Sequence, residues 1–367
     1  MLNPRAERNG GLDAARGLAM GLMVLVNNAG DWSHVYAQLR HAEWHGFTLA
    51  DLVFPLFLWV SGASAAWSLA RVRAARAAGE PVPGAWGRAS RRAGILFGLG
   101  LALNFLPACD PSSLRIMGVL QRIALVALFL HAWARLVPAR LDLAGALLLL
   151  AAWSLLLAVP EGGLDPATNL GARLDRLIFT TAHLYRGAEF DPEGLLSTMG
   201  ACATGLLGLA TGEALRSRGS AAARVRTCAF GAALLATGLA LSPWVPVNKP
   251  LWTSSYVLVA AGLCAWIWAA LDAASAWRPW RAPHLVLSAM GRNALLLYVG
   301  SGLLARFLAW WKPSGAEGGS ARVLLHEALF GDMADPRLGS LLFAAANLLA
   351  WCPLLVWLDR RGWRWSA

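Results

Sequence analysis

The sequence predicts an all-α, polytopic integral membrane protein with about ten transmembrane helices and both termini in the cytoplasm. The chain has 367 residues, of which 57% are hydrophobic and only 14% are charged, whereas soluble domains carry about 25% charged residues. The mean hydropathy is +0.51. The apolar residues gather in repeated long runs, and a run of about 20 apolar residues can cross a bilayer as a helix.

Ten segments are apolar and long enough to be candidate spans. The first and third are short, so we expect them to extend or tilt. No internal repeat and no separate soluble domain is evident, so we expect one transmembrane domain over residues 1–367. The candidate spans are Arg16–Gly30, Leu52–Ala70, Ala93–Ala108, Ile116–Val137, Leu141–Val159, Leu195–Leu215, Cys228–Val245, Leu251–Leu271, Leu285–Trp310 and Leu341–Leu358.

The distribution of basic residues sets the predicted orientation. With the N-terminus in the cytoplasm, the cytoplasmic segments hold nineteen of the 32 Lys and Arg residues, and the outer segments hold ten although they are longer in total. Cytoplasmic loops of membrane proteins are enriched in Lys and Arg. The same pattern accounts for the net charge of +11, so we do not predict nucleic-acid binding. The segment that contains His41 falls on the outer face.

Several other classes of protein find no support in the sequence. The five cysteines are odd in number and scattered without a CxxC pair, so neither a disulfide framework nor a zinc site is predicted. No GxxxxGK[ST] loop occurs, and no GxGxxG follows a strand, which argues against an ATP-driven pump and a dehydrogenase. The basic N-terminus and its apolar run resemble a signal peptide, but no small-residue cleavage site follows, so we expect this run to be the first span.

The stretch His41–Gly62 combines a dense polar cluster with an apolar run. It reads HAEWHGFTLADLVFPLFLWVSG. Histidine is the side chain best suited to proton transfer near neutral pH, so we interpret His41 as the centre of an active site; the alternative is a solvated surface histidine. His41 and His45 also have the i, i+4 spacing of some metal ligands, with Glu43 or Asp51 as a third. No HExxH-type pattern is present, so no metal is expected.

Asp51 has both a structural and a functional interpretation. The pattern Thr48-x-x-Asp51 before an apolar run has the form of a capping box, in which the two side chains bind free backbone N–H groups at a helix start. The functional alternative is that Asp51 orients His41. The two roles are compatible.

Polar residues also occur inside the predicted spans. Arg122 lies in GVLQRIALV, and Arg292 and Asn293 lie in SAMGRNALLLYV. Charges inside a membrane are costly, so they are candidates for functional residues. The structural alternative is that each arginine lies near a helix end and extends to the interface.

Seven strings along the chain carry a resemblance to a known family. They are LDAARGLAM at Leu12–Met20, VNNAG at Val26–Gly30, the His41–Gly62 stretch, RIMGVLQRIA at Arg115–Ala124, LDRLIFTTAHLYRGAEFDPEGLLST at Leu174–Thr198, PVNKPLWTSSYVLVAAG at Pro246–Gly262 and GRNALLLYVG at Gly291–Gly300. In this order they resemble the heparan-α-glucosaminide N-acetyltransferase family of membrane acyltransferases and its bacterial relatives. The resemblance runs through most of the chain.

The resemblance implies transfer of an acetyl group from cytosolic acetyl-CoA to an amino sugar or other glycan acceptor on the far side of the membrane. The family's catalytic histidine opens the motif HAxWxGxTxADLVFP and falls on His41, and its partner asparagine falls on Asn27. A bacterial relative implies a multi-pass protein of the bacterial inner membrane, with a periplasmic outer face. The alternative that the resemblance leaves open is an inner-membrane transporter of N-acetylglucosamine or related sugars, which needs no acetyl-CoA.

These implications assign expected roles. His41 acts as a general base or carries the acetyl group, Asn27 supplies an oxyanion donor, and Asp51 orients His41. Inner-face arginines bind the phosphates of acetyl-CoA. The expected partners are the acceptor, the lipid bilayer and a second copy of the chain in a homodimer. The candidates for binding the acetyl-CoA co-substrate are Arg16, Arg122, Arg292 and Asn293.

Overall fold

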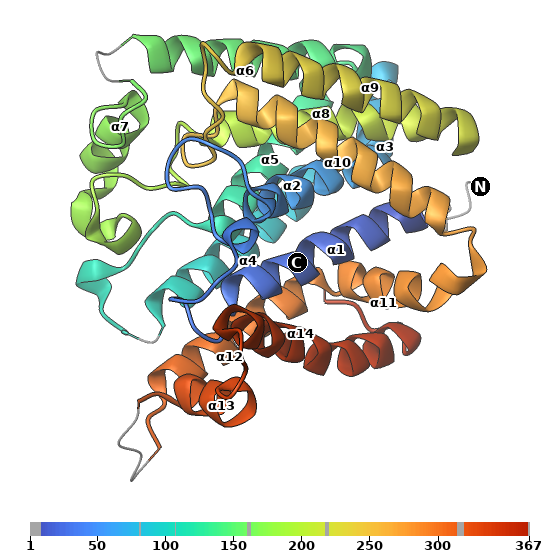
Figure 1. The fold of residues 1–367 in the computed structure, drawn as a ribbon. Coiled ribbons are helices and arrows are strands. Elements are labelled where there is room, and N and C mark those ends of the chain that lie inside the picture. Colours follow the sequence, from blue (N-terminus) through green and yellow to red (C-terminus); the bar gives the residue numbers. More distant parts are fainter. Residues whose placement is uncertain are drawn as a thin grey trace. The chain divides into compact units, whose positions relative to one another are not determined.

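The computed structural model describes residues 9–80, 82–106, 108–159, 163–216, 220–313 and 319–365. Within these ranges it contains helices and no strand, which confirms the predicted all-α class (Figure 1). The α-helices are α1 (Gly10–Asn27), α2 (Leu49–Ser68), α3 (Ala70–Ala78), α4 (Ala85–Phe105), α5 (Val119–Leu136), α6 (Asp142–Ala158), α7 (Leu170–Phe179), α8 (Thr198–Arg216), α9 (Ser220–Leu241), α10 (Ser254–Ala274), α11 (Arg281–Arg292), α12 (Ala294–Trp310), α13 (Ala321–Phe330) and α14 (Pro336–Arg360).

Each predicted span corresponds to a helix or a helix pair, but the count of ten is not confirmed. Among the described residues, six helices are long and apolar enough to cross a membrane, and a bent pair adds a seventh. The six are α2, α5, α6, α9, α10 and α14. The helices α1, α4 and α8 have 18, 21 and 19 residues, so they are long enough to cross a membrane. They are not among the six, because they are less apolar or carry more charged residues.

The segment Leu285–Trp310, which we predicted as one span, consists of two helices. α11 and α12 are bent by 80° at a break that contains Asn293. Asn293 has φ −114° and ψ 31°, outside the helical range, and its Oδ1 accepts the Trp365 backbone N–H at 3.2 Å. The expectation of one continuous helix is therefore wrong, because a hydropathy pattern records that residues are apolar and not the direction of the chain.

The contacts divide the chain into two compact units, which are described separately. Unit 1 comprises residues 1–41, 48–57 and 267–366, and unit 2 comprises residues 42–47 and 58–266 with residue 367. Helix α2 contributes its first nine residues to unit 1 and the remainder to unit 2. Our expectation of one domain over residues 1–367 stays a prediction.

Unit 1 is built around α1, α11 and α14, which lie side by side in Figure 1. Their apolar core includes Met20, Met290 and Leu355, all buried. The backbones of α1 and α11 approach very closely, because a Cβ atom added at Gly17 would lie 1.8 Å from the Leu287 carbonyl oxygen. Small residues allow this close approach between membrane helices.

In unit 2, glycines allow a similarly close approach between the backbones of α2 and α8. A Cβ atom at Gly208 would lie 2.1 Å from the Trp59 carbonyl oxygen, and one at Gly212 would lie 2.1 Å from that of Ala63. These glycines therefore bring one backbone directly against another.

A buried ion cluster joins α3, α6 and α8 in unit 2. Arg73 binds both oxygens of Asp142 at 2.9 and 2.8 Å and the Glu213 carboxylate at 3.1 Å. Asp142 is fully buried and also accepts the Trp133 indole N–H at 2.9 Å. Paired in this way, the charges avoid the high cost of burying an isolated ion.

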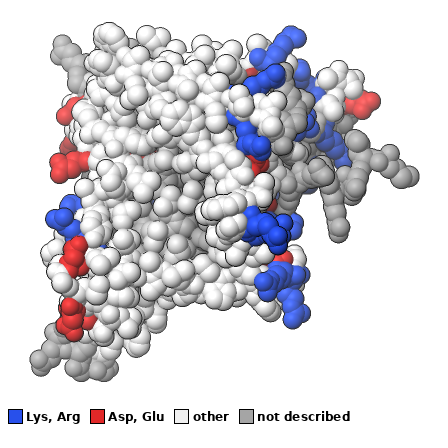
Figure 2. All heavy atoms as spheres, turned by 45° about the vertical axis from the view of Figure 1, so that its right-hand side comes forward, with Lys and Arg blue, Asp and Glu red and all other residues white. Residues whose placement is uncertain are grey.

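The surface is suited to a lipid environment. The face in Figure 2 is largely free of charged side chains, which lie along its margins. In unit 2, large apolar side chains such as Leu148, Leu155 and Val225 are 70%, 68% and 70% exposed. Apolar area of this extent is unfavourable in water and favourable against lipid. The structure thus supports a multi-pass membrane protein.

We predict that Gly208→Ala destabilises the protein. The added methyl group overlaps the Trp59 carbonyl oxygen, so α2 and α8 have to separate, and overpacking of this kind typically costs about 1–3 kcal/mol. The matched control is Gly98→Ala on α4, where a Cβ atom meets nothing within 4 Å and alanine is the better helix former. Thermal unfolding in detergent checks this; equal midpoints for the two variants would contradict the described α2–α8 packing.

Candidate active site

His41 is bound to a buried carboxylate in unit 1. It lies in the loop between a three-residue 3₁₀ turn, Ala37–Leu39, and α2. Its Nδ1 is 2.9 Å from Oδ1 of Asp51, the third residue of α2. The Asp51 side chain is 1% exposed and the His41 side chain 48%. A half-exposed imidazole therefore lies against an anchored carboxylate.

The second oxygen of Asp51 caps α2. Asp51 Oδ2 accepts the Thr48 backbone N–H at 3.1 Å and is 3.0 Å from the Thr48 hydroxyl, which also lies 2.8 Å from the Arg40 carbonyl oxygen. The backbone N–H of Leu49, the first residue of α2, donates to Gln38 Oε1 at 3.1 Å. The capping contact predicted for Asp51 is confirmed, and the same side chain contacts His41.

The partner of Nδ1 decides the tautomer of His41. An ionised carboxylate only accepts hydrogen bonds, so Nδ1 carries the proton that it donates to Asp51. The lone pair of the neutral imidazole is then on Nε2. A base oriented by a third group is a recurring arrangement in nucleophilic and general-base catalysis. The pair can therefore accept a proton at a defined atom.

Asn27 ends α1 and its side chain is exposed, while the adjacent Asn28 is buried. The Asn28 amide donates to the Val24 carbonyl at 2.7 Å and accepts from Asn347 at 3.5 Å. Of the two asparagines, Asn28 has a structural role and Asn27 presents its amide to the surroundings. The predicted partnership of Asn27 with His41 stays a prediction.

The structure brings Arg16 and Arg292 together around one carboxylate. Asp13, four residues into α1, lies 3.4 Å from Arg16 and 3.4 Å from Arg292 through its two oxygens. Arg292 also forms two bonds of 2.6 Å with Asp359 near the end of α14. Our sequence reasoning missed both carboxylates, although Asp13 stands in the LDAARG string three residues before Arg16.

Asn293, at the break between α11 and α12, is fully buried. Its Oδ1 accepts from Trp365, and its Nδ2 lies 3.4 Å from the Ala289 carbonyl oxygen. Both ends of this amide therefore stabilise the bend. Its predicted role in donor binding stays a prediction.

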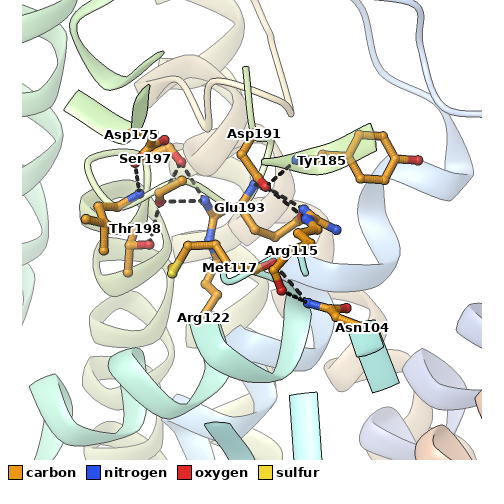
Figure 3. Close-up of polar contacts among 12 residues, drawn as sticks. Asn104, Arg115, Met117, Arg122, Asp175, Tyr185, Asp191, Glu193, Ser197 and Thr198 are labelled. Carbon is orange, nitrogen blue, oxygen red and sulfur yellow. Dashed lines mark hydrogen bonds and ion pairs between the residues drawn. The ribbon is translucent and has the colours of Figure 1, made fainter. Parts of the chain in front are cut away.

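Arg122 is fully buried near the start of α5 in unit 2, so it does not extend to solvent (Figure 3). Its Nη2 donates to the Gly194 carbonyl at 3.1 Å and to Ser197 Oγ at 2.5 Å. The guanidinium carbon lies 4.8 Å from the Trp252 ring centroid, within the range of a cation–π interaction. Trp252 itself has φ 54°, an uncommon conformation for a bulky residue.

A second ion cluster adjoins Arg122. Arg115 binds both oxygens of Asp191 at 2.9 and 2.6 Å and also contacts Glu193 (Figure 3). Burial raises the pKa of Glu193, but the charges of Arg115, Arg122 and Lys249 outweigh it and lower that pKa below its usual value. Sequence reasoning singled out none of these acids, although they lie within the Leu174–Thr198 string.

Asp175 of α7 lies beside this cluster, and its pKa is shifted in the opposite direction from that of Glu193. Burial raises the pKa of Asp175 to about 6, with a further contribution from the charge of Asp191. Its Oδ1 accepts the Leu195 backbone N–H at 3.0 Å, which acts in the opposite direction. The described residues contain no group of three His, Cys, Asp or Glu side chains placed to hold a metal ion.

Comparisons with known proteins agree with the resemblance found in the sequence. Residues 8–167 match the family model "Heparan-alpha-glucosaminide N-acetyltransferase, catalytic". The chain is 28% identical to the human heparan-alpha-glucosaminide N-acetyltransferase over 82% of its own length and 54% of the relative, and 27% identical to the mouse protein over the same shares. It thus spans about half the length of the curated relatives it matches.

The matched region contains His41, Asp51, Asn27 and Arg122, whereas Arg292 and Asn293 lie beyond residue 167. The matches give no support to the transporter alternative. Both comparisons therefore confirm the resemblance predicted from the sequence, to proteins named heparan-alpha-glucosaminide N-acetyltransferase.

Proposed function

We propose that this chain transfers an acetyl group from cytosolic acetyl-CoA to an amino sugar of the glucosamine type, or to another glycan acceptor, at the periplasmic face of a bacterial inner membrane. The observation that carries the proposal is the 2.9 Å contact between His41 Nδ1 and Asp51. It provides an oriented imidazole, and the similarity of residues 8–167 to an acetyltransferase catalytic model supports its use in acetyl transfer.

The chemistry requires a base because an amine is mostly protonated near pH 7. In the direct path, His41 Nε2 takes a proton from the ammonium form of the acceptor, and the neutral amine attacks the thioester carbonyl carbon. The second proton of the amine is released to water as the amide forms. The carbon–sulfur bond breaks as the CoA thiolate leaves, and the thiolate takes the proton from the imidazolium. Asp51 stabilises that imidazolium. In the covalent path, Nε2 attacks the thioester carbonyl carbon, the carbon–sulfur bond breaks and the CoA thiolate leaves. The neutral acceptor amine then displaces the imidazole from the acetyl group, and the proton of the amine goes to the thiolate.

Asn27 supplies the remaining element of acyl transfer. The tetrahedral intermediate carries negative charge on the former carbonyl oxygen, and an amide N–H that is already in place stabilises this charge. The exposed Asn27 side chain at the end of α1 provides such a donor.

Acetyl-CoA has to reach from the cytosol to His41, which is expected on the outer face. Its phosphates bind Arg16 and Arg292, and its uncharged pantetheine arm lies between helices. In unliganded protein the two arginines share Asp13, and Asp359 also holds Arg292. A phosphate therefore competes with carboxylates that already bind them. Arg122 and Asn293 are the other proposed donor-binding residues, and Arg122 is also the candidate for the acceptor side. The homodimer stays a prediction.

We predict that the segments rich in basic residues face the cytoplasm and that the segments between them face the outside of the cell. Single cysteines at His41, His183 and Lys249 are expected to react with an impermeant reagent from outside intact cells, and one at Arg76 is not. The native cysteines are removed first. Arg218, also expected to be cytoplasmic, lies outside the described residues. Labelling at position 76 without labelling at 183 would reverse the orientation and contradict a periplasmic acceptor.

We predict that Arg16→Ala and Arg292→Ala each weaken acetyl-CoA binding by about one to two orders of magnitude. A charge-assisted hydrogen bond to phosphate contributes roughly 1.5–3 kcal/mol. The matched control in unit 1 is Arg306→Ala, whose guanidinium donates to the Gly302 carbonyl of its own helix at 3.1 Å. Calorimetric binding and thermal unfolding are measured together, because Arg292→Ala also removes a partner from Asp359. If the affinity for acetyl-CoA is unchanged in both variants, Arg16 and Arg292 do not form the donor site.

We predict that His41→Ala abolishes most acetyl transfer while acetyl-CoA binding and folding persist. General-base assistance is typically worth roughly 10²–10⁴ in rate, and Asn27→Ala is expected to cost about 10²–10³, the effect of one lost oxyanion donor. The assay is CoA release by purified protein with glucosamine and related amino sugars. A carrier histidine becomes radiolabelled from acetyl-CoA without acceptor, whereas a pure base does not.

Two results would contradict this site and this function. If His41→Ala retains transfer within about tenfold of the parent, His41 is not the catalytic residue. If the parent neither binds nor turns over acetyl-CoA but moves N-acetylglucosamine into vesicles, it is a transporter.

A further inference from the structure

The segment Ala42–Phe47 belongs to unit 2 and is hydrogen-bonded to the rest of it at two points. The Trp44 indole N–H donates to the Leu164 carbonyl at 3.0 Å, and the Gly46 backbone N–H donates to the Val247 carbonyl at 2.8 Å. Trp44 also packs edge-on against Phe190 with ring centroids 5.4 Å apart. Gly46 has φ +128°, which favours glycine. Between these two anchors lies His45, whose side chain is exposed.

His45 contacts an asparagine whose orientation is fixed. Asn248 is fully buried, and its Oδ1 accepts the Leu251 backbone N–H at 2.7 Å. A backbone N–H can only donate, so the atom that faces it is the amide oxygen. The Asn248 amide nitrogen is therefore the atom that lies 3.3 Å from His45 Nδ1.

This contact fixes the tautomer of His45. An amide nitrogen only donates, so Nδ1 of His45 accepts, and the proton of the neutral imidazole is on Nε2. His41, four residues earlier, has the opposite assignment because its Nδ1 donates to a carboxylate. The chain therefore holds one histidine with a basic Nε2 and one with an Nε2–H donor.

We infer that His45 is a residue that binds the acceptor and donates a hydrogen bond from Nε2–H to one of its hydroxyl oxygens. This inference rests on the proposed function. An imidazole held in place by its neighbours loses little freedom on binding, which favours affinity. A neutral donor also adds no positive charge next to an acceptor whose amine is mostly protonated. Covalent geometry alone keeps the His45 backbone within about 14 Å of that of His41.

His183 provides an internal reference for the tautomer. It also lies in unit 2, and its Nδ1 is 2.8 Å from the Leu114 carbonyl oxygen. A carbonyl only accepts, so His183 carries its proton on Nδ1. In ¹⁵N-histidine NMR of the detergent-solubilised chain, we expect His45 to show the Nε2–H pattern and His183 the Nδ1–H pattern, each assigned by substitution. An Nδ1–H pattern at His45 in the parent would overturn the inference.

The kinetic test uses three variants with glucosamine as the acceptor. His45→Ala is expected to raise the KM for glucosamine about 3–10-fold, the effect of one lost hydrogen bond, with kcat and the KM for acetyl-CoA nearly unchanged. His45→Gln keeps a side-chain N–H donor and is expected to recover part of the loss. Asn248→Asp keeps the oxygen that accepts from Leu251 but places an acceptor opposite His45, so Nδ1 becomes protonated and the NMR pattern changes.

The outcomes separate this inference from the function on which it depends. A parent that releases CoA with glucosamine, combined with an unchanged KM in His45→Ala, overturns the role of His45 alone. A parent that releases no CoA with any amino sugar overturns the proposed function and this inference with it.

Discussion

The buried carboxylate of Asp51 connects the start of a central helix with the candidate catalytic histidine. One of its oxygens caps α2 through Thr48 and the other contacts His41. A buried carboxylate needs hydrogen-bond donors, and Thr48 supplies two of them independently of His41. Asp51 lies in the part of α2 that belongs to unit 1, as His41 does, so the imidazole is oriented by a residue of its own unit.

Paired charges recur in both units. Arg73 with Asp142, Arg115 with Asp191 and Arg292 with Asp359 all use two hydrogen bonds between guanidinium and carboxylate. Arg122 is different, because among the described residues its Nε and Nη1 have no hydrogen-bond partner and its plane faces Trp252. An anion that binds Arg292 therefore has to replace its carboxylate partners, whereas one that binds Arg122 has to reach a fully buried guanidinium.

The features that the sequence predicts correctly are local. The helical class and the positions of helices follow from apolar runs, and the cap at Asp51 follows from a pattern of four residues. The bend at Asn293 and the partners of Arg292 do not, because they depend on residues far along the chain: Asp13 is 279 positions away and Asp359 is 67. The same holds for Arg115 and Asp191, which are 76 positions apart. Periodicity and hydropathy carry no information about such pairs.

The two histidines of the HAEWHG string show how little chemistry is fixed by residue type alone. Both are exposed loop residues, and both present Nδ1 to a side chain. The difference between them is one atom in the partner, a carboxylate oxygen of Asp51 against an amide nitrogen of Asn248. That atom decides which ring nitrogen holds the proton, and so whether Nε2 can accept a proton or donate a hydrogen bond. In the proposed acyl transfer, His41 accepts a proton of the amine and His45 donates a hydrogen bond to a hydroxyl of its sugar, and a neutral imidazole at the second position adds no positive charge.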